Sequence, residues 1–337
     1  MRIRPHLLLG LAVAAALGPL AACGSADSSS GPADAGGGTS TASDGFPVTI
    51  EHGQGTVEIP AKPTRVVALS WTDAQIAEAL GAPVVAAVRN PDSEDGNWPA
   101  TSFDGDVLSL DPVTPELEAI ASHQPDLILM TAAQPTFGQE YEQLSQIAPT
   151  ISYDTALLRD DGDRLAELIG AALGESAAAA DLIASSDAAI AGFRAEHPAL
   201  EGARVVFAQN YQGSTGAIVS DDSPVVRFFG RLGLTVPDEL ARLAGDDAAY
   251  GTVQLADENL DLLDTADAVF VNTPEGEDAF AAIPTVRDLA LTEKGTLFFT
   301  GNELAGMLLT PNPATTDVLL DRLGGPLSEV AEALTGP

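Results

Sequence analysis

Cysteine, basic residues and long apolar runs are all scarce in this sequence of 337 residues. The one cysteine excludes a disulfide framework and any thiolate metal cluster. Lys and Arg number 15 against 49 Asp and Glu, and the formal net charge of −34 repels phosphate, which disfavours nucleic-acid binding. Hydrophobic residues nevertheless make up 45% of the chain and the mean hydropathy is +0.13, so the composition supports a packed core rather than general disorder. The length suits two lobes or domains of about 150 residues each.

The apolar run at the N-terminus is short. Arg2 and Arg4 form a basic start, and the run from Leu7 to Leu17 would span about 16 Å as a helix, roughly half of a bilayer core. This pattern is typical of a secretory signal rather than of a membrane-spanning helix. The run is followed by LAACG at residues 20–24, which resembles a bacterial lipobox.

The lipobox resemblance implies that residues 1–22 are a signal peptide and that the thiol of Cys23 takes a diacylglycerol before cleavage. Acylation of the new amino terminus, as with palmitate, usually follows. Two or three acyl chains, at about 0.8 kcal/mol for each buried methylene, give durable anchoring. Residues 23–45 would then form a lipidated, flexible tether, and we expect the body of the protein to lie outside the cytoplasmic membrane. The alternative is a chance cysteine behind an ordinary signal peptide.

The body alternates short β-rich runs with helical segments of about ten residues, which predicts parallel sheets flanked by helices. A Gly-rich turn predicts a small hairpin over 48–59. Strands are expected at 65–69, 84–88, 127–130, 150–153, 204–208, 217–219, 268–271 and 296–299. Helices are expected at 72–80, 138–147, 225–232, 258–263, 279–283 and 313–323, with one more opening at 114–117.

One segment breaks this rhythm. Residues 175–196 are rich in Ala, contain no Pro and have Gly only at position 192, so they predict a helix of about 33 Å. The simplest arrangement is α/β, with two lobes joined by this single long helix. The N-terminal lobe would span 46–174, the connecting helix 175–197 and the C-terminal lobe 198–337.

Several segments in a fixed order resemble one known family. They are RVVALSW (65–71), LEAI (117–120), QPDLIL (124–129) and YEQLSQIAPT (141–150), with a looser match from Pro284 to Leu323. In this order, behind a lipobox, they resemble the substrate-binding lipoproteins of ABC importers for iron-siderophores, cobalamin or haem. The resemblance implies two Rossmann-like lobes with a ligand cleft between them. It also implies capture of a ferric siderophore and its delivery to a membrane permease driven by an ATPase subunit.

The resemblance further implies two permease-docking carboxylates, one on each lobe. Matching by motif places them at Glu118, in LEAI, and at Glu258, in DENL (257–260). Exposed charges add little stability but orient an encounter well, which suits a transient partner. The alternative is that both are ordinary solvated helix carboxylates. The sequence contains no phosphate-binding loop of the G-x-x-x-x-G-K-[ST] type, which is consistent with ATP hydrolysis on another subunit. We expect a monomer in solution.

Aromatic residues near strand ends are the first candidates for ligand contact, because clefts of this kind are lined by strand ends and the loops after them. Trp71 follows a predicted strand directly, and Trp98 lies in a polar loop where no periodicity explains its burial. In relatives an aromatic ligand contact occupies the place of Tyr250. Tyr153 and Tyr211 also follow strands. Core packing is the alternative for Trp71, Tyr153 and Tyr211.

Cations are the second group of candidates, because so few are present. Arg89 ends a predicted strand and could contact anionic oxygens of a chelate; a solvated strand-end charge is the alternative. Arg227 and Arg287 are weaker candidates, because helical positions explain both. Relatives that bind hydroxamates often place an arginine just before the helix of the first docking Glu, whereas this chain reads Leu110-Asp111-Pro112. The sparse basic set favours a ferric hydroxamate or mixed-ligand siderophore over a highly anionic triscatecholate.

Other functions are possible interpretations of the sequence, both within this family and outside it. Haem would need an axial ligand, and His52, His123 and His197 occupy poor positions for one, which leaves Tyr250 or Met307. Cobalamin is a further alternative, and a structural or adhesion lipoprotein is the alternative from another class. The sequence contains no G-x-S-x-G or H-E-x-x-H motif, so we expect no enzyme, no catalytic residue, and neither a resident metal nor a cofactor.

Overall fold

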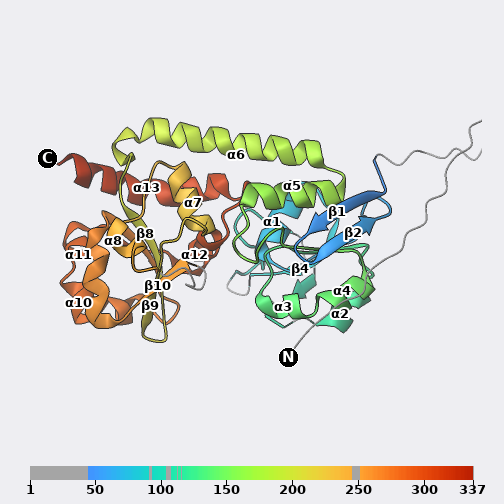
Figure 1. Ribbon diagram of the computed structural model, residues 1–337, viewed down its shortest axis with the longest axis horizontal. Helices are drawn as coiled ribbons and strands as arrows, with labels where there is room; N and C mark the ends of the chain where they lie inside the picture. The colour runs from blue at the N-terminus through green and yellow to red at the C-terminus, as the bar shows by residue number, and fades with distance from the viewer. Residues whose placement is uncertain are drawn as a thin grey trace, which may run out of the picture. The chain divides into compact units, whose positions relative to one another are not determined.

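The computed structural model describes residues 45–90, 93–103, 108–111, 113–114, 116–244 and 251–336. The part from residue 45 onward contains two five-stranded sheets and a separate two-stranded hairpin, with helices around both larger sheets (Figure 1). The expected α/β fold of two sheet-bearing lobes is confirmed. Among the described residues, no helix is both long and apolar enough to span a bilayer.

The sheet of the N-terminal lobe is entirely parallel, with the strand order β5-β4-β3-β6-β7. Its strands are short and mostly buried, which explains their continuous apolar sequences. They are β3 (Val66–Ala68), β4 (Val84–Val88), β5 (Leu108–Leu110), β6 (Leu127–Met130) and β7 (Thr150–Ser152). The chain leaves β3 toward β4 on one side and returns to β6 on the other, so the strand order reverses between β3 and β6. In open α/β sheets, ligands bind beside such a reversal at the carboxyl ends of the strands.

Helices cover both faces of this sheet. They are α1 (Trp71–Ala79), α2 (Leu117–Ser122), α3 (Pro135–Gln139), α4 (Tyr141–Ile147) and α5 (Gly162–Leu173). Helix α1 begins where the Ser70 side chain accepts a hydrogen bond from the Asp73 amide, and Gly81 with a φ of 71° follows its end. The single helix expected over 138–147 is two helices, because Glu140 leaves helical geometry between α3 and α4.

The predicted N-terminal hairpin is present as β1 (Val48–His52) and β2 (Gly55–Ile59), paired antiparallel. The inward side chains of Ile50 and Ile59 join the apolar cluster under α1 and α5. The hairpin therefore extends the core of the N-terminal lobe rather than forming a separate unit.

The sheet of the C-terminal lobe is mixed, with the order β10-β9-β8-β11-β12. Its strands are β8 (Val205–Tyr211), β9 (Ser214–Ile218), β10 (Thr252–Leu255), β11 (Ala268–Asn272) and β12 (Leu297–Phe299). The expectation of parallel strands alone was wrong here, because β9 runs antiparallel to both β8 and β10. Gln212 and Gly213, with φ of 51° and 73°, form a two-residue turn that sends the chain straight back. Such turns match the twist of hairpin strands.

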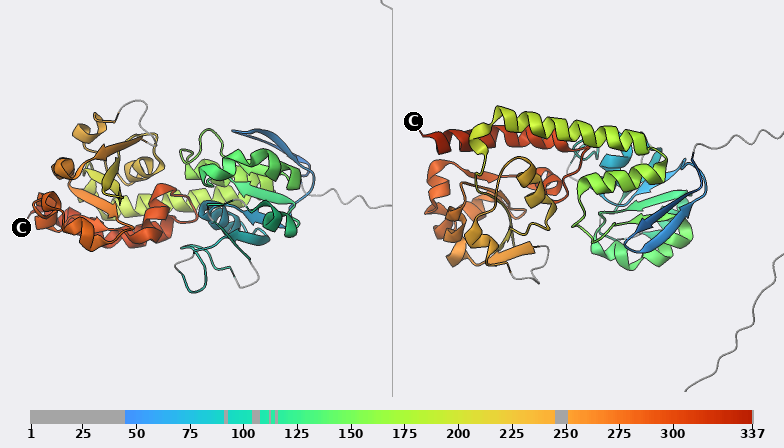
Figure 2. Two further views of the ribbon diagram at one scale, coloured as in Figure 1. Left: turned by 90° about the horizontal axis from the view of Figure 1, so that it is seen from below. Right: turned by 45° about the horizontal axis from the view of Figure 1, so that its top comes forward.

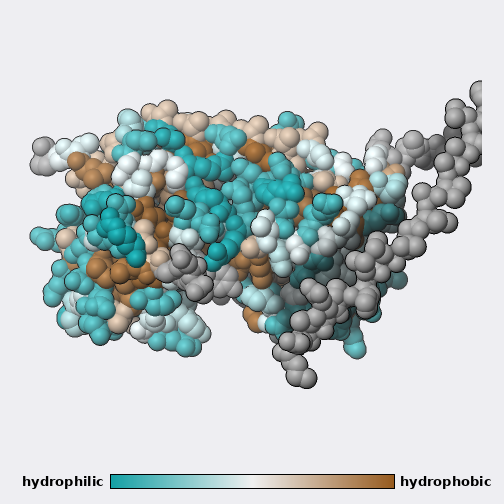
Figure 3. Space-filling model, in the orientation of Figure 1, coloured by the Kyte–Doolittle hydropathy of each residue, from teal (hydrophilic) through white to brown (hydrophobic). Residues whose placement is uncertain are grey.

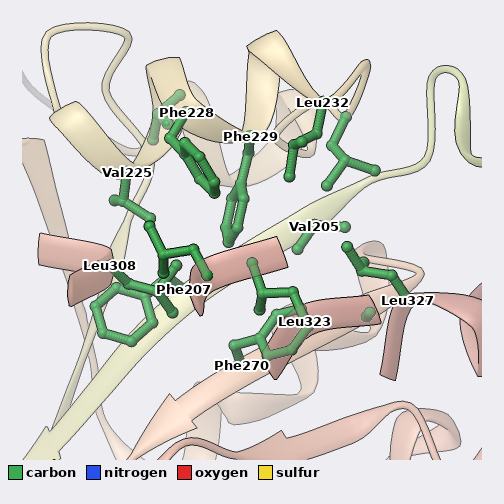
Figure 4. Close-up of a cluster of buried hydrophobic side chains, with 14 of the residues drawn as sticks. Val205, Phe207, Val225, Phe228, Phe229, Leu232, Phe270, Leu308, Leu323 and Leu327 are labelled. Carbon is green, nitrogen blue, oxygen red and sulfur yellow. The ribbon is translucent and has the colours of Figure 1, made fainter. Parts of the chain in front are cut away.

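The helices of this lobe also lie on both faces of its sheet. They are α7 (Pro224–Arg231), α8 (Asp238–Ala241), the 3₁₀ segment η3 (Asp257–Thr265), α9 (Glu277–Ala281), α10 (Pro284–Arg287), α11 (Ala290–Lys294) and α12 (Gly301–Leu309). One face has an aromatic core, in which Phe207 and Phe270 of the sheet meet Phe228 and Phe229 of α7 (Figure 4). This packing fixes the position of α7, whose first turn borders the cleft described below.

One long helix extends along both lobes, and a second lies beside it on the C-terminal lobe. The Ala-rich run forms α6 (Ser176–Glu196), which leads through the short 3₁₀ turn η1 (Pro198–Leu200) into the C-terminal lobe. The last helix, α13 (Thr316–Thr335), lies along α6 in both Figure 1 and Figure 2, and the hydroxyls of Ser186 and Thr316 are 2.7 Å apart. The sequence predicted this helix only up to residue 323. The face in Figure 3 is mostly hydrophilic, with the weakly hydrophobic Ala-rich surface of α6 along its upper edge.

Candidate ligand-binding site

A cleft of about 290 Å³ lies where the two lobes face each other. Its lining combines apolar side chains with a few amides, hydroxyls and one guanidinium, as ligand pockets commonly do. The lining residues are Trp71, Gln134, Pro135, Leu158, Arg159, Gln209, Ile218, Ser223, Pro224, Val225, Thr252, Leu309 and Thr310. No carboxylate is among these described lining residues.

The topology of both sheets places these residues together. Trp71 follows β3 and Gln134 follows β6, the two strands between which the order of the N-terminal sheet reverses. From the other lobe, Gln209 lies near the carboxyl end of β8, beside β11. The cleft therefore occupies the position at which the strand order predicts a ligand.

Trp71 is held in the cleft by both lobes. Its indole Nε1 donates a 2.9 Å hydrogen bond to the hydroxyl of Thr310, which ends α12 of the other lobe. Behind it lies Trp98, with the ring centroids 5.4 Å apart. The Trp98 Nε1 donates to the carbonyl of Val88 at 3.0 Å, so this second indole supports Trp71 and is not itself part of the lining.

A buried carboxylate organises the loops under Trp71. Asp73 is fully buried and accepts hydrogen bonds from the hydroxyls of Ser70 (2.6 Å) and Thr131 (2.6 Å) and from the Thr131 amide (3.0 Å). It thereby joins the end of β3 to the end of β6, the point of the reversal. Burial raises the pKa of Asp73 to about 6, although these hydrogen bonds oppose the increase.

Arg89 does not reach the cleft lining. Its guanidinium donates to the carbonyls of Gly96 (2.8 Å) and Asp95 (2.6 Å) and lies 5.6 Å from the ring centre of Phe103. Only 8% of the residue is exposed. These contacts give Arg89 a structural role in the loop that carries Trp98. The sequence could not show that this loop folds back onto the strand that precedes it.

Two of the three tyrosine candidates lie outside the cleft lining, and the third lies outside the described residues. Tyr153 packs against the hairpin turn, where its carbonyl accepts from the Gly53 amide at 2.7 Å. Tyr211 is 59% exposed at the turn between β8 and β9. Neither lines the cleft. Tyr250 lies outside the described residues, as does Cys23.

The structure also places the two docking candidates and three of the possible haem ligands. Glu118 on α2 and Glu258 on η3 are both exposed, one on each lobe. His52 contacts the Tyr141 hydroxyl at 3.3 Å, and burial lowers its pKa. The ring of His197 lies against that of Phe193 at the end of α6, with the two rings tilted, and Met307 lies within the C-terminal core. None of these residues is in the described lining of the cleft.

Sequence reasoning missed the only cation in the described lining, Arg159. Its Nη1 lies 3.6 Å from the carboxylate of Asp222, which belongs to the other lobe. Thr310 and Gln209 were missed as well. Arg159 follows β7, so the rule that the cleft is lined by loops after strands could have found it. Arg159 was not recognised as a cleft residue because it lies among other polar residues.

Comparisons with known proteins agree with the two lobes and the cleft described above. A model of the periplasmic binding protein family matches residues 66–304. The chain belongs to this family. A solved solute-binding protein of Mycobacterium smegmatis is 28% identical with a TM-score of 0.70, and the similarity covers 85% of this chain and 99% of that one.

Two of the curated relatives are named for a particular ferric siderophore. The ferric-anguibactin-binding protein FatB of Vibrio anguillarum is 34% identical over 112 residues, a match that spans 32% of each chain. The ferric enterobactin-binding protein FepB of Escherichia coli is 25% identical over 277 residues, which is 77% of this chain and 85% of FepB. The resemblance to siderophore-binding members of the family is therefore confirmed by sequence, while the solved structure confirms the fold.

Proposed function

We propose that this chain captures a ferric siderophore outside the cytoplasmic membrane and delivers it to the permease of an ABC importer. The observation that carries the proposal is the cleft itself, in which the indole of Trp71 and the guanidinium of Arg159 face residues of the opposite lobe. An aromatic face suits the organic shell of a chelate, and a guanidinium suits its metal-binding oxygens. The curated relatives FatB and FepB are both named for ferric siderophores.

The chelate that fits this cleft has a low net charge. Arg159 is the one cation in the described lining, since Arg89 is engaged in its own loop. A chain with a net charge of −34 adds no long-range attraction for an anion. A ferric hydroxamate or a mixed-ligand siderophore therefore fits better than a triscatecholate, although the name of FepB includes enterobactin.

Binding requires no chemistry on the ligand. Siderophore capture needs a cleft that excludes water from the chelate and a few oriented polar groups, which Trp71, Arg159, Gln209 and Thr310 supply. With the lobes connected by the single long helix α6, we expect lobe closure to be small, because a continuous helix bends little. The ligand should be released unchanged.

Docking and anchoring complete the proposal. Glu118 and Glu258 lie exposed on separate lobes, as needed for two contacts with a permease that spans both. Cys23 in LAACG would carry the lipid that keeps the protein at the membrane. Metabolic labelling with a palmitate analogue tests this point, since Cys23→Ser should abolish the label.

Titration calorimetry of residues 24–337 tests the ligand proposal. The panel should contain ferrichrome as a neutral ferric trihydroxamate, ferric enterobactin as an anionic triscatecholate, haem and cobalamin. We expect one ferric chelate to bind at submicromolar concentration with one site per chain and to be recovered intact. Binding of haem or cobalamin alone would refute siderophore capture, and recovery of a hydrolysed chelate would refute a purely binding role.

A further inference from the structure

Helix α7 presents the guanidinium of Arg227 to the opposite lobe. Its Nη2 donates to the carbonyl of Arg159 at 2.6 Å, and its Nη1 donates to the carbonyl of Asp222 at 2.7 Å. Its Nε lies 3.4 Å from the carboxylate of Asp161. One planar group thus connects the backbone of the N-terminal lobe at Arg159 to the backbone of the C-terminal lobe at Asp222.

The side chains of these two connected residues also meet. Arg159 Nη1 lies 3.6 Å from Asp222 Oδ2, so the two residues are linked once through their side chains and once through Arg227. A guanidinium can hold two carbonyls at a fixed separation because its donors form a rigid fork. An ammonium group at this position would hold them less rigidly, because it is a compact charge on a flexible stem.

The loop that carries Arg159 is held in a conformation that requires support. Leu158, which lines the cleft beside Arg159, has a φ of 58°, in the left-handed region that residues with a branched side chain rarely adopt. Such a backbone persists only when its surroundings hold it. The Asp160 carboxylate closes the loop by accepting from the amides of residues 154–156, and Arg227 fixes the next carbonyl after Leu158.

We propose that Arg227 is a positioning residue, which sets the place of the Arg159 guanidinium in the cleft and thereby the affinity for the oxygen atoms of the bound chelate. The inference rests on the proposed function, since it assigns Arg159 as the cation that contacts the chelate. Arg227 itself is absent from the described lining and acts through the carbonyl of Arg159.

Arg231 provides a matched control on the same helix. It also bridges the lobes, but its ion pairs are with Asp163 at 3.3 Å and Asp187 at 2.5 Å, on α5 and α6. Loss of Arg231 therefore removes a comparable charge and comparable contacts between lobes, without removing a hydrogen bond to the Arg159 loop.

A double-mutant cycle in the mature protein tests the proposal. Arg159→Gln and Arg227→Ala should each weaken binding of the preferred chelate about tenfold, the usual effect of one lost charge-assisted hydrogen bond. Because Arg227 acts through Arg159, the double variant should bind about as well as Arg159→Gln alone. Arg227→Lys should fail to restore affinity, since it keeps the charge but not the fork, and Arg231→Ala should bind like the unaltered protein.

Hydrogen exchange without ligand gives an independent readout. In Arg227→Ala and Arg227→Lys, the amides of residues 154–160 should exchange faster than in the unaltered protein, whereas Arg231→Ala should leave them unchanged. Additive losses in the cycle, full affinity in Arg227→Lys, or unchanged exchange would overturn the positioning role while siderophore capture stands. If the unaltered protein binds no ferric chelate, the proposed function fails and this assignment fails with it.

Discussion

The indole nitrogen of Trp71 and the hydroxyl of Thr310 are 2.9 Å apart, although 239 positions separate the two residues in the sequence. The same hydroxyl accepts a second hydrogen bond, from Thr72 at 2.8 Å. Thr310 ends α12 of the C-terminal lobe, while Trp71 and Thr72 begin α1 of the N-terminal lobe. A single side chain therefore both links the lobes and fixes the orientation of the aromatic ring in the cleft.

Thr310→Val should loosen this link without changing the volume of the side chain. Trp71 Nε1 and the buried Thr72 hydroxyl would lose their acceptor, and an unsatisfied buried donor costs about 1–3 kcal/mol. We expect the free energy of unfolding in urea to fall by about that amount. Thr310→Ser keeps the hydroxyl and should recover most of the loss. Equal stability of the Val and Ser variants would contradict this account.

The two tryptophans should report ligand binding unequally. Trp71 lines the cleft, whereas Trp98 lies behind it with its indole NH bonded to the Val88 carbonyl. Quenching of intrinsic fluorescence by a ferric chelate should therefore survive in Trp98→Phe. In Trp71→Phe the quenching should be smaller and the affinity lower, as measured in parallel by calorimetry. A Trp71→Phe variant that binds as tightly as the unaltered protein would remove Trp71 from the site.

Most buried strands could be predicted from the sequence, because the apolar run that marks each of them is local. Leu127–Met130 was predicted and observed with the same bounds, since a parallel strand covered on both faces reads as a continuous apolar run. The strands β5 and β10 were missed, because they are only three and four residues long. The turn at Gln212–Gly213, which makes β9 antiparallel, was also missed. Gln rarely adopts a positive φ, so its presence does not indicate such a turn.

The sequence predicted a residue of the site only where a single lobe positions that residue. Trp71 was predicted from its place after a strand, and the strand end indeed borders the cleft. Arg159 also follows a strand, but its meeting with Thr310 in one cleft depends on the approach of two lobes, which no spacing in the sequence encodes. Arg89 shows the reverse case, because a strand-end cation was expected at the ligand and instead holds its own loop.

Asp73 predicts a pH dependence of stability. Its pKa in the folded protein, about 6, lies above the ordinary value of 3.8, so the folded state binds the proton more tightly than the unfolded state does. The stability that Asp73 contributes is therefore fully present below about pH 4 and is lost as the pH rises through 6. A difference of two pH units corresponds to about 3 kcal/mol.

Urea unfolding between pH 4 and 7.5 checks this contribution. The stability of the unaltered protein relative to Asp73→Asn should decline across that range, because Asn cannot ionise. Asp95→Asn is the control: hydrogen bonds from Ser93 and Asn97 lower the pKa of this exposed carboxyl to about 2, below the range. Parallel stability curves for the unaltered protein and Asp73→Asn would show that burial of Asp73 has no such effect.

The two exposed carboxylates Glu118 and Glu258 should matter for uptake and not for ligand binding. Both lie away from the described lining of the cleft, so Glu118→Ala with Glu258→Ala should leave the affinity for the chelate unchanged. Uptake of labelled ferric siderophore by cells should fall several-fold, because rim charges act mainly on the rate of encounter. Glu142→Ala with Glu277→Ala removes the same charge from other exposed helix starts and should leave uptake intact. If both double variants reduce uptake equally, net charge rather than a docking pair controls delivery.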